Sequence, residues 1–94
     1  MSLAIDVVKR SGKRPTESFD LDKLLRSVLA ACLSVRTPEG EANDTARKVT
    51  GAVVIWLDTK PAVTSHDIRR ITSTHLSRFH PEAAYFYQHH KHII

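Results

Sequence analysis

The stretch that decides the fold is Val7-Val8-Lys9-Arg10-Ser11-Gly12, followed after a short spacer by Glu17-Ser18-Phe19-Asp20-Leu21-Asp22-Lys23-Leu24. Residues 4–10 alternate around β-branched side chains, which favours a strand. Ser11-Gly12 predicts a tight turn, because glycine adopts positive φ without steric cost. The chain should return over residues 14–19 as a second strand, with Pro15 at a sheet edge or a bulge. The sequence therefore predicts a β-hairpin that leads directly into a helix.

Two helices are expected next, each with an apolar stripe at helical spacing. Asp20 is a suitable N-cap for a helix over residues 21–33, and residues 36–40 then form a loop. A second helix is expected over residues 43–57, in which Gly51 is either a weak point or the site of a close helix crossing. The predicted core face of this second helix comprises Ala46, Val49, Val53 and Trp56, with Leu57 on its flank.

The second half of the chain predicts a short strand and two further helices. Residues 62–64 could add a third strand beside the hairpin, and Thr64 or Ser65 then caps a helix whose apolar stripe uses His75 or Leu76 and ends at Phe79. Pro81 restarts the chain as a helix, since proline is favoured at the first helical position. This order of elements indicates one small helical bundle with strands on one face.

Composition limits the chain to a single small globular domain. The 94 residues are 41% hydrophobic and 26% charged, which is ordinary for a globular protein. No segment reaches the ~20 apolar residues of a membrane span, and the long apolar region of a signal peptide is missing. The single Cys32 excludes a disulfide framework within the chain and fits a reducing, cytoplasmic location.

Positive charge is concentrated in the opening region. Between positions 9 and 26 there are six cations and three acids, which account for most of the net charge of +4. Such a local excess suits a small polyanion better than a long phosphate backbone. Binding of a small polyanion is therefore the favoured function. The alternative is a small basic nucleic-acid-binding domain that uses the turn at residues 9–14 together with Arg69 and Arg70. A purely structural interaction domain is a further alternative. Against nucleic acid, the basic residues do not line one helix face and no recognised binding motif is present.

The order and spacing of the motifs point to a known family. They read Val7-x-Lys9-Arg10-x-Gly12, then Glu17-x-Phe19-Asp20-x-x-Lys23-Leu24, then Val63-Thr64-Ser65-x-Asp67-Ile68, before a closing aromatic helix. This pattern resembles the ATP-cone, the regulatory nucleotide-binding domain of many ribonucleotide reductases and of the repressor of reductase genes. The resemblance covers about residues 5–91, and the domain is expected over residues 4–92. It implies an α+β, mainly α fold, a four-helix bundle capped by a two- or three-stranded sheet, with ATP or dATP between them and Mg²⁺ accompanying the triphosphate.

The resemblance also implies which residues bind the nucleotide. They are Val7, Lys9, Arg10, Glu17, Phe19, Asp20, Lys23, Leu24, Ser65, Arg69, Tyr87 and Lys91. Lys9, Arg10, Lys23 and Lys91 would contact phosphate or ribose oxygens. Without the resemblance, solvated hairpin ends are the better interpretation of Lys9 and Arg10, and a solvated lysine is an equal alternative for Lys23. Ser65 would add a hydroxyl at a helix start, where free N–H groups favour anions.

The adenine end of the expected site rests on a carboxylate and apolar walls. Glu17 can accept a hydrogen bond from the exocyclic amine of adenine, whereas the guanine carbonyl would meet it acceptor to acceptor. Phe19 and Leu24 would wall the base, or they are ordinary core residues, or both. Some family members carry Asn at the position of Asp20, and Asp20 offers only acceptors, so helix capping is its better-founded role.

Arg69 and the histidines near the end of the sequence bear on the sugar and on metal binding. Arg69 stands where the family often has His near the sugar and could bind phosphate instead, which leaves the choice between ATP and dATP open. His89, His90 and His92 lack the spacing of a zinc site, and no catalytic arrangement is evident. We therefore expect a non-catalytic allosteric module. Its bound nucleotide would change how copies of the domain, or the domain and a host catalytic domain, associate, with no membrane partner.

Overall fold

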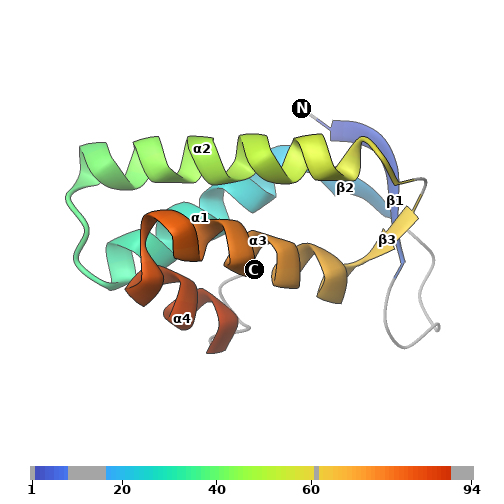
Figure 1. Cartoon of the computed structure of the whole chain (residues 1–94). Helices are drawn as coiled ribbons and strands as arrows, with labels where there is room; N and C mark the ends of the chain where they lie inside the picture. Colours follow the sequence, from blue (N-terminus) through green and yellow to red (C-terminus); the bar gives the residue numbers. More distant parts are fainter. Residues whose placement is uncertain (1, 9–16, 61, 90–94) are drawn as a thin grey trace.

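The computed structural model describes residues 2–8, 17–60 and 62–89, with side chains from Phe19 onward. The elements run in the order β1 (Ser2–Val8), β2 (Glu17–Asp20), α1 (Leu21–Ser34), α2 (Glu39–Leu57), β3 (Ala62–Thr64), α3 (Ser65–Phe79) and α4 (Pro81–His89). Figure 1 shows the helices packed side by side, with the strands gathered at one end of the bundle. The predicted fold class, a mainly helical α+β domain, is confirmed.

The sheet has three strands in the order β2-β1-β3, so the predicted third strand is confirmed. β1 pairs antiparallel with β2, as expected for a hairpin, and its register shifts between Leu3 and Asp6. β3 pairs parallel with β1, through Asp6↔Ala62 to Val8↔Thr64. The predicted turn at Ser11-Gly12 and the edge position of Pro15 lie outside the described residues. The second strand is described only from Glu17.

The core lies between the four helices and under the sheet. Its largest fully buried side chains include Val28 of α1, Val49, Val53 and Leu57 of α2, Leu76 of α3 and Tyr87 of α4. Phe19 of β2 and Val63 of β3 extend this core into the sheet. Cys32 is buried without a disulfide, and burial raises the pKa of its thiol. The strands therefore cover one end of the bundle and share its core.

Helix α2 differs from expectation in three ways. It begins at Glu39, not at residue 43. The Pro38 carbonyl accepts the first helical hydrogen bond, from the Ala42 N–H at 2.8 Å, and the Glu39 and Glu41 carboxylates interact favourably with the positive end of the helix dipole. Its core face turns Leu57 fully inward, whereas Trp56 is only partly buried. A Cβ added to Gly51 would meet no atom within 4 Å, so the expected close crossing at Gly51 is absent within the described chain.

Helices α3 and α4 follow the sequence more closely. Thr64, not Ser65, is the N-cap of α3, and of the two candidates for its apolar stripe Leu76, not His75, is buried. Phe79, predicted to close the apolar stripe, is 50% exposed because α3 ends there. α4 begins at Pro81 as predicted. None of the helices within the described ranges combines the length and apolar character needed to cross a membrane.

Candidate functional site

The sheet brings the sequence motifs together at the level of the backbone. Val7 pairs with Glu17 of β2 on one side and with Val63 of β3 on the other. Its neighbour Val8 pairs with Thr64, the residue directly before Ser65 and the start of α3. Three motifs that are far apart in the sequence therefore meet at one place, beside a helix N-terminus. The side chains of Val7 and Glu17, and the whole of Lys9, Arg10 and Lys91, lie outside the described part, so their roles stay predictions.

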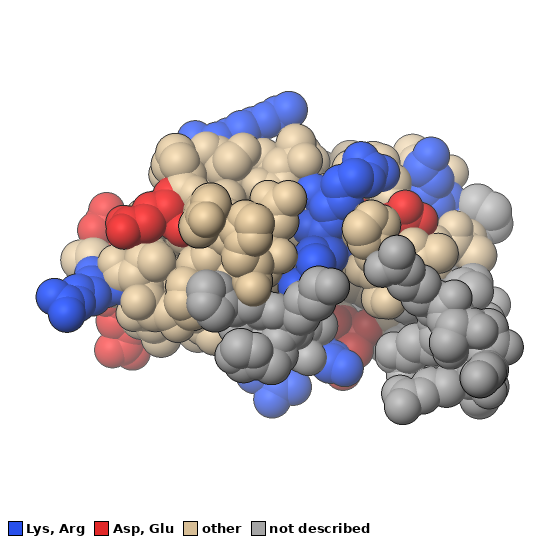
Figure 2. Space-filling view, turned by 90° about the horizontal axis from the view of Figure 1, so that it is seen from below, with Lys and Arg blue, Asp and Glu red and all other residues tan. Residues whose placement is uncertain are grey.

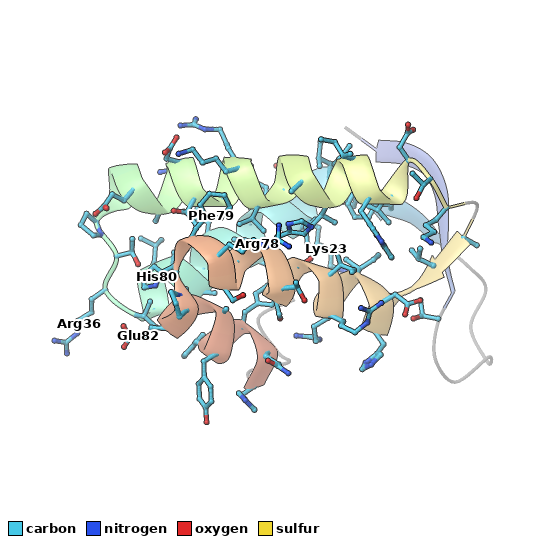
Figure 3. The ribbon with its side chains drawn as sticks, viewed as in Figure 1. Lys23, Arg36, Arg78, Phe79, His80 and Glu82 are labelled. Carbon is cyan, nitrogen blue, oxygen red and sulfur yellow. The ribbon has the colours of Figure 1, made fainter. Side chains whose placement is uncertain are left out.

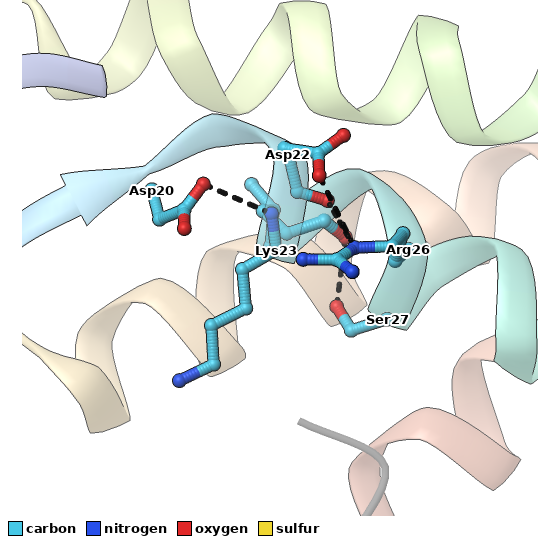
Figure 4. A network of polar contacts seen from close by, with 6 residues as sticks. Asp20, Asp22, Lys23, Arg26 and Ser27 are labelled. Atoms are coloured by element: carbon cyan, nitrogen blue, oxygen red, sulfur yellow. Dashed lines mark hydrogen bonds and ion pairs between the residues drawn. The ribbon is translucent and has the colours of Figure 1, made fainter. Parts of the chain in front are cut away.

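The start of α1 is fixed by Asp20 and leaves Lys23 exposed. An Asp20 carboxylate oxygen accepts a hydrogen bond from the Lys23 backbone N–H at 3.2 Å, which confirms the predicted cap. Figure 4 shows the Lys23 ammonium extending away from both Asp20 and Asp22. Asp22 is instead paired with Arg26, at 3.3 Å. Lys23 thus presents a cation that the nearby acids of α1 do not neutralise.

Phe19 and Leu24 flank this helix start and point into the core. Their exposed fractions are 3% and 5%, respectively, and both belong to the main hydrophobic cluster. The core reading of these residues is therefore confirmed. Contact with a base, which the resemblance also implies for them, stays a prediction.

The start of α3 carries a complete capping box. The Thr64 hydroxyl accepts from the Asp67 N–H at 3.0 Å, and the Asp67 carboxylate accepts from the Thr64 N–H at 3.2 Å. These hydrogen bonds hold the pKa of Asp67 below its usual value. Ser65 is the exposed first residue of the helix. The box leaves the Ser65 hydroxyl and the first helical N–H groups, those of Ser65 and His66, available to an anion.

A polar link between helices lies deeper in the bundle. The Ser27 hydroxyl donates to the Leu24 carbonyl at 2.8 Å, so the Tyr87 hydroxyl, 3.1 Å away, donates to Ser27. Burial raises the pKa of Tyr87 and keeps it protonated for this role, although the bond to Ser27 opposes the shift. Arg69 donates to the Tyr87 carbonyl at 3.3 Å and lies 5.8 Å from the centre of the Tyr87 ring. Helices α1, α3 and α4 are therefore tied together at Tyr87.

The hydrogen bonds at Tyr87 show that the face of α1 carrying Ser27 and the face of α3 carrying Arg69 both contact α4. Lys23 lies one turn before Ser27 on α1, and Ser65 lies one turn before Arg69 on α3, so each pair shares a face. Figure 2 shows Lys and Arg side chains gathered in the middle of the face seen from below. Ser27 was not predicted from the sequence. Its spacing of four residues from Lys23 is the signal that could have found it.

A different hollow lies at the opposite end of the bundle. It has a volume of about 360 Å³ and is lined by Val35, Arg36, Thr37, Pro38, Glu41, Thr45, Phe79 and His80. None of the predicted site residues lines it. Figure 3 shows Arg36, His80 and Glu82 at this end and Lys23 nearer the middle of the molecule. The described residues hold no group of three or more His, Cys, Asp or Glu side chains that could bind a metal ion.

The fold defines a class: a small helical module capped at one end by a three-stranded sheet, with the start of α3 directly after strand β3. The sequence model of the ATP cone domain family matches residues 5–93, so the chain belongs to that family. It is an allosteric, nucleotide-binding regulatory domain, and the family implies that the nucleotide carries adenine. Comparison with curated proteins and comparison with solved structures each found no match.

Proposed function

We propose that this domain senses the adenine nucleotide pool by binding ATP or dATP, and that it passes the result to a ribonucleotide reductase or a related regulator. The observation that supports this most is the meeting of Glu17, Val7 and Val63 in adjacent strands, directly before Ser65. With that arrangement, the candidate base contact and the candidate phosphate contact would lie on one small sheet and the helix start that follows it. The buried, unbridged Cys32 is compatible with the cytoplasmic location that we also propose.

The phosphates would be held by side chains from two helices and from the hairpin. Lys23 supplies an exposed ammonium, and Ser65 supplies a hydroxyl beside free N–H groups. Lys9, Arg10 and Lys91 would complete the positive end, in keeping with the family pattern. Mg²⁺ would arrive with the triphosphate, ligated by phosphate oxygens and water.

Arg69 could couple phosphate binding to the position of α4. Its guanidinium donates a hydrogen bond to the Tyr87 carbonyl, which belongs to the last turn of α4. A phosphate is a stronger partner than a neutral carbonyl, because the bond is then charge-assisted on both sides. A bound triphosphate that attracts Arg69 would weaken its hold on α4. Nucleotides that differ in this effect would favour different positions of α4 and hence different assemblies.

The base would be read by the strands. Glu17 would accept from the adenine amine, with Val7 beside it on the paired strand. Phe19 and Leu24 support this end from the core, and Asp20 fixes the helix start.

Calorimetric titration with ATP, dATP and GTP, each with Mg²⁺, tests the proposal. Binding of the adenine nucleotides and not of GTP is the expected result. Lys9→Ala should weaken ATP binding clearly, and a change below about twofold would contradict its phosphate role. Salt-sensitive oligonucleotide binding without affinity for nucleotides would instead support the nucleic-acid alternative.

A further inference from the structure

Helix α2 carries an exposed stripe of residues that lies outside the buried core. The stripe consists of Asp44, Lys48, Gly51, Ile55 and Asp58, spaced alternately four and three residues apart, and all of them are exposed. Such spacing places them along one line of the helix surface. In Figure 1, α2 runs along the edge of the bundle, so one of its sides faces solvent. We call this set the outer stripe of α2.

The centre of the outer stripe is unusual for a surface helix. Ile55 is 73% exposed, the most of any large hydrophobic side chain in the described part of the protein. Gly51, one turn earlier, is open on its outer side, because a Cβ placed there would meet nothing within 4 Å. Glycine inside a helix is destabilising relative to alanine, and no internal packing explains it here. The pair forms an apolar projection beside a notch in the helix backbone.

The outer stripe is complementary to itself. If two copies of α2 pack antiparallel about a two-fold axis beside Val53, Ile55 of each copy faces Gly51 of the other. In the same register Lys48 faces Asp58 of the second copy, and the symmetry produces each contact twice. A register centred on Gly51 would instead oppose Asp44 with Asp58, which are like charges. We propose that the outer stripe is the contact between two copies of this chain.

The charges at the ends of the stripe favour this pairing. The last turn of α2 contains no basic residue and is followed by Asp58, an acid at the end of the helix where the dipole favours a cation. Lys48 of a second copy would supply that cation. Its present contacts are Asp44 at 3.0 Å, with both side chains 57% exposed, and the Phe79 ring, whose centre lies 6.0 Å from the ammonium. Exposed contacts of this kind exchange at little cost.

The size of the contact sets its strength. The stretch from Lys48 to Asp58 is only about 15 Å long, so the buried area is below that of a standard interface. The dimer should therefore be weak and concentration-dependent, as suits association that a ligand adjusts. The inference deepens the proposed function, since it names the surface for self-association, but the contact itself does not require bound nucleotide.

Sedimentation equilibrium over about 10 µM to 1 mM protein, without nucleotide, tests the contact. Lys48→Glu and Asp58→Lys should each weaken dimerisation about tenfold or more, and the double variant should restore it, because the charges are exchanged and the pairing is kept. Ile55→Ser should also weaken it. Gly51→Ala should raise Tm and yet weaken the dimer, since the new methyl group fills the notch while favouring the helix.

Arg26→Glu is the matched control. It makes the same change of charge and also breaks an exposed ion pair four residues apart, but on α1. It should leave dimerisation unchanged. A wild-type chain that stays monomeric at 1 mM, a double variant that does not recover, or an Ile55→Ser variant as dimeric as wild type would each overturn the inference. ATP titration of Ile55→Ser separates the two proposals, because a monomer that still binds ATP leaves the proposed function intact.

Discussion

The two ends of the bundle use their polar groups in different ways. At the sheet end, Lys23 and Ser65 are exposed beside two helix starts, and the strands carry Val7, Glu17 and Phe19. At the loop end, the polar groups bond to one another. Thr37 Oγ1 lies 2.7 Å from His80 Nε2, and His80 Nδ1 accepts from the Ala83 N–H at 3.4 Å. The second bond places the ring proton on Nε2, so His80 donates to Thr37.

The loop end is also closed by its backbone. Arg36 adopts a positive φ of 64°, and its N–H donates to the Leu33 carbonyl at 3.0 Å. The Thr37 N–H donates to the Cys32 carbonyl at 3.0 Å. A hollow lined by polar residues therefore need not be a ligand site. Polar groups that already satisfy one another are structural, whereas the exposed Lys23 ammonium is open to the phosphate that we propose for it.

The largest expected effect separates the ends by nucleotide affinity. Lys23→Ala should lower the affinity for ATP by about tenfold or more, since a hydrogen bond to a charged group is lost. Its Tm should stay close to wild type because the side chain is exposed. Arg36→Ala, which removes a cation from the loop end, should leave calorimetric affinity unchanged. An equal loss in both variants would show that overall charge, and not the sheet end, governs binding.

The next prediction is that Thr64 and Ser65, two neighbouring residues at the sheet end, differ in function: Thr64 supports stability and Ser65 supports ATP binding. Thr64→Ala should cost about 1–2 kcal/mol in the free energy of unfolding, because the capping box is lost. Ser65→Ala should leave stability nearly unchanged and weaken ATP binding. Urea unfolding and calorimetry on both variants measure the split. A stability loss for Ser65→Ala as large as that for Thr64→Ala would place Ser65 among the structural residues.

A smaller effect is expected at the loop end. Thr37→Val keeps the shape of the side chain and removes the hydroxyl that His80 contacts, so it should cost about 1 kcal/mol in the free energy of unfolding. ATP affinity should not change. An altered ATP affinity in this variant would show that the two ends are coupled, and would contradict a purely structural role for the loop end.

The smallest effect concerns pH and Asp67. Folding lowers the pKa of this carboxyl below its ordinary value of 3.8, so its stabilising contribution is present above that value and is lost as the pH falls through the lower folded pKa. Urea unfolding at pH 6 and at pH 3 should show a smaller acid loss for Asp67→Asn than for wild type. Asp22→Asn, on the exposed side of α1, is the control. Equal acid sensitivity of wild type and Asp67→Asn would contradict the role of the capping box.

Features that depend on a few adjacent residues could be predicted from the sequence. The Asp20 cap and the start at Pro81 are local, because each needs only its own side chain and the next turn of helix. The start of α2 was missed since no side chain caps it. The choice between Trp56 and Leu57 for the core was also missed. These two residues are adjacent, and the direction of the core is set by α1 and α3 and not by the spacing within α2.

The sequence by itself determined the class of the protein, the order of its elements and the motif residues of the expected site, because periodicity, caps and motif spacing are written in neighbouring positions. Only the tertiary structure decided that Ser27 would meet Tyr87, sixty positions away, and that Arg69 would hold the last turn of α4. It also decided that Gly51 and Ile55 would face outward. Contacts of this kind depend on how whole helices pack, and helix packing is fixed by the shared core.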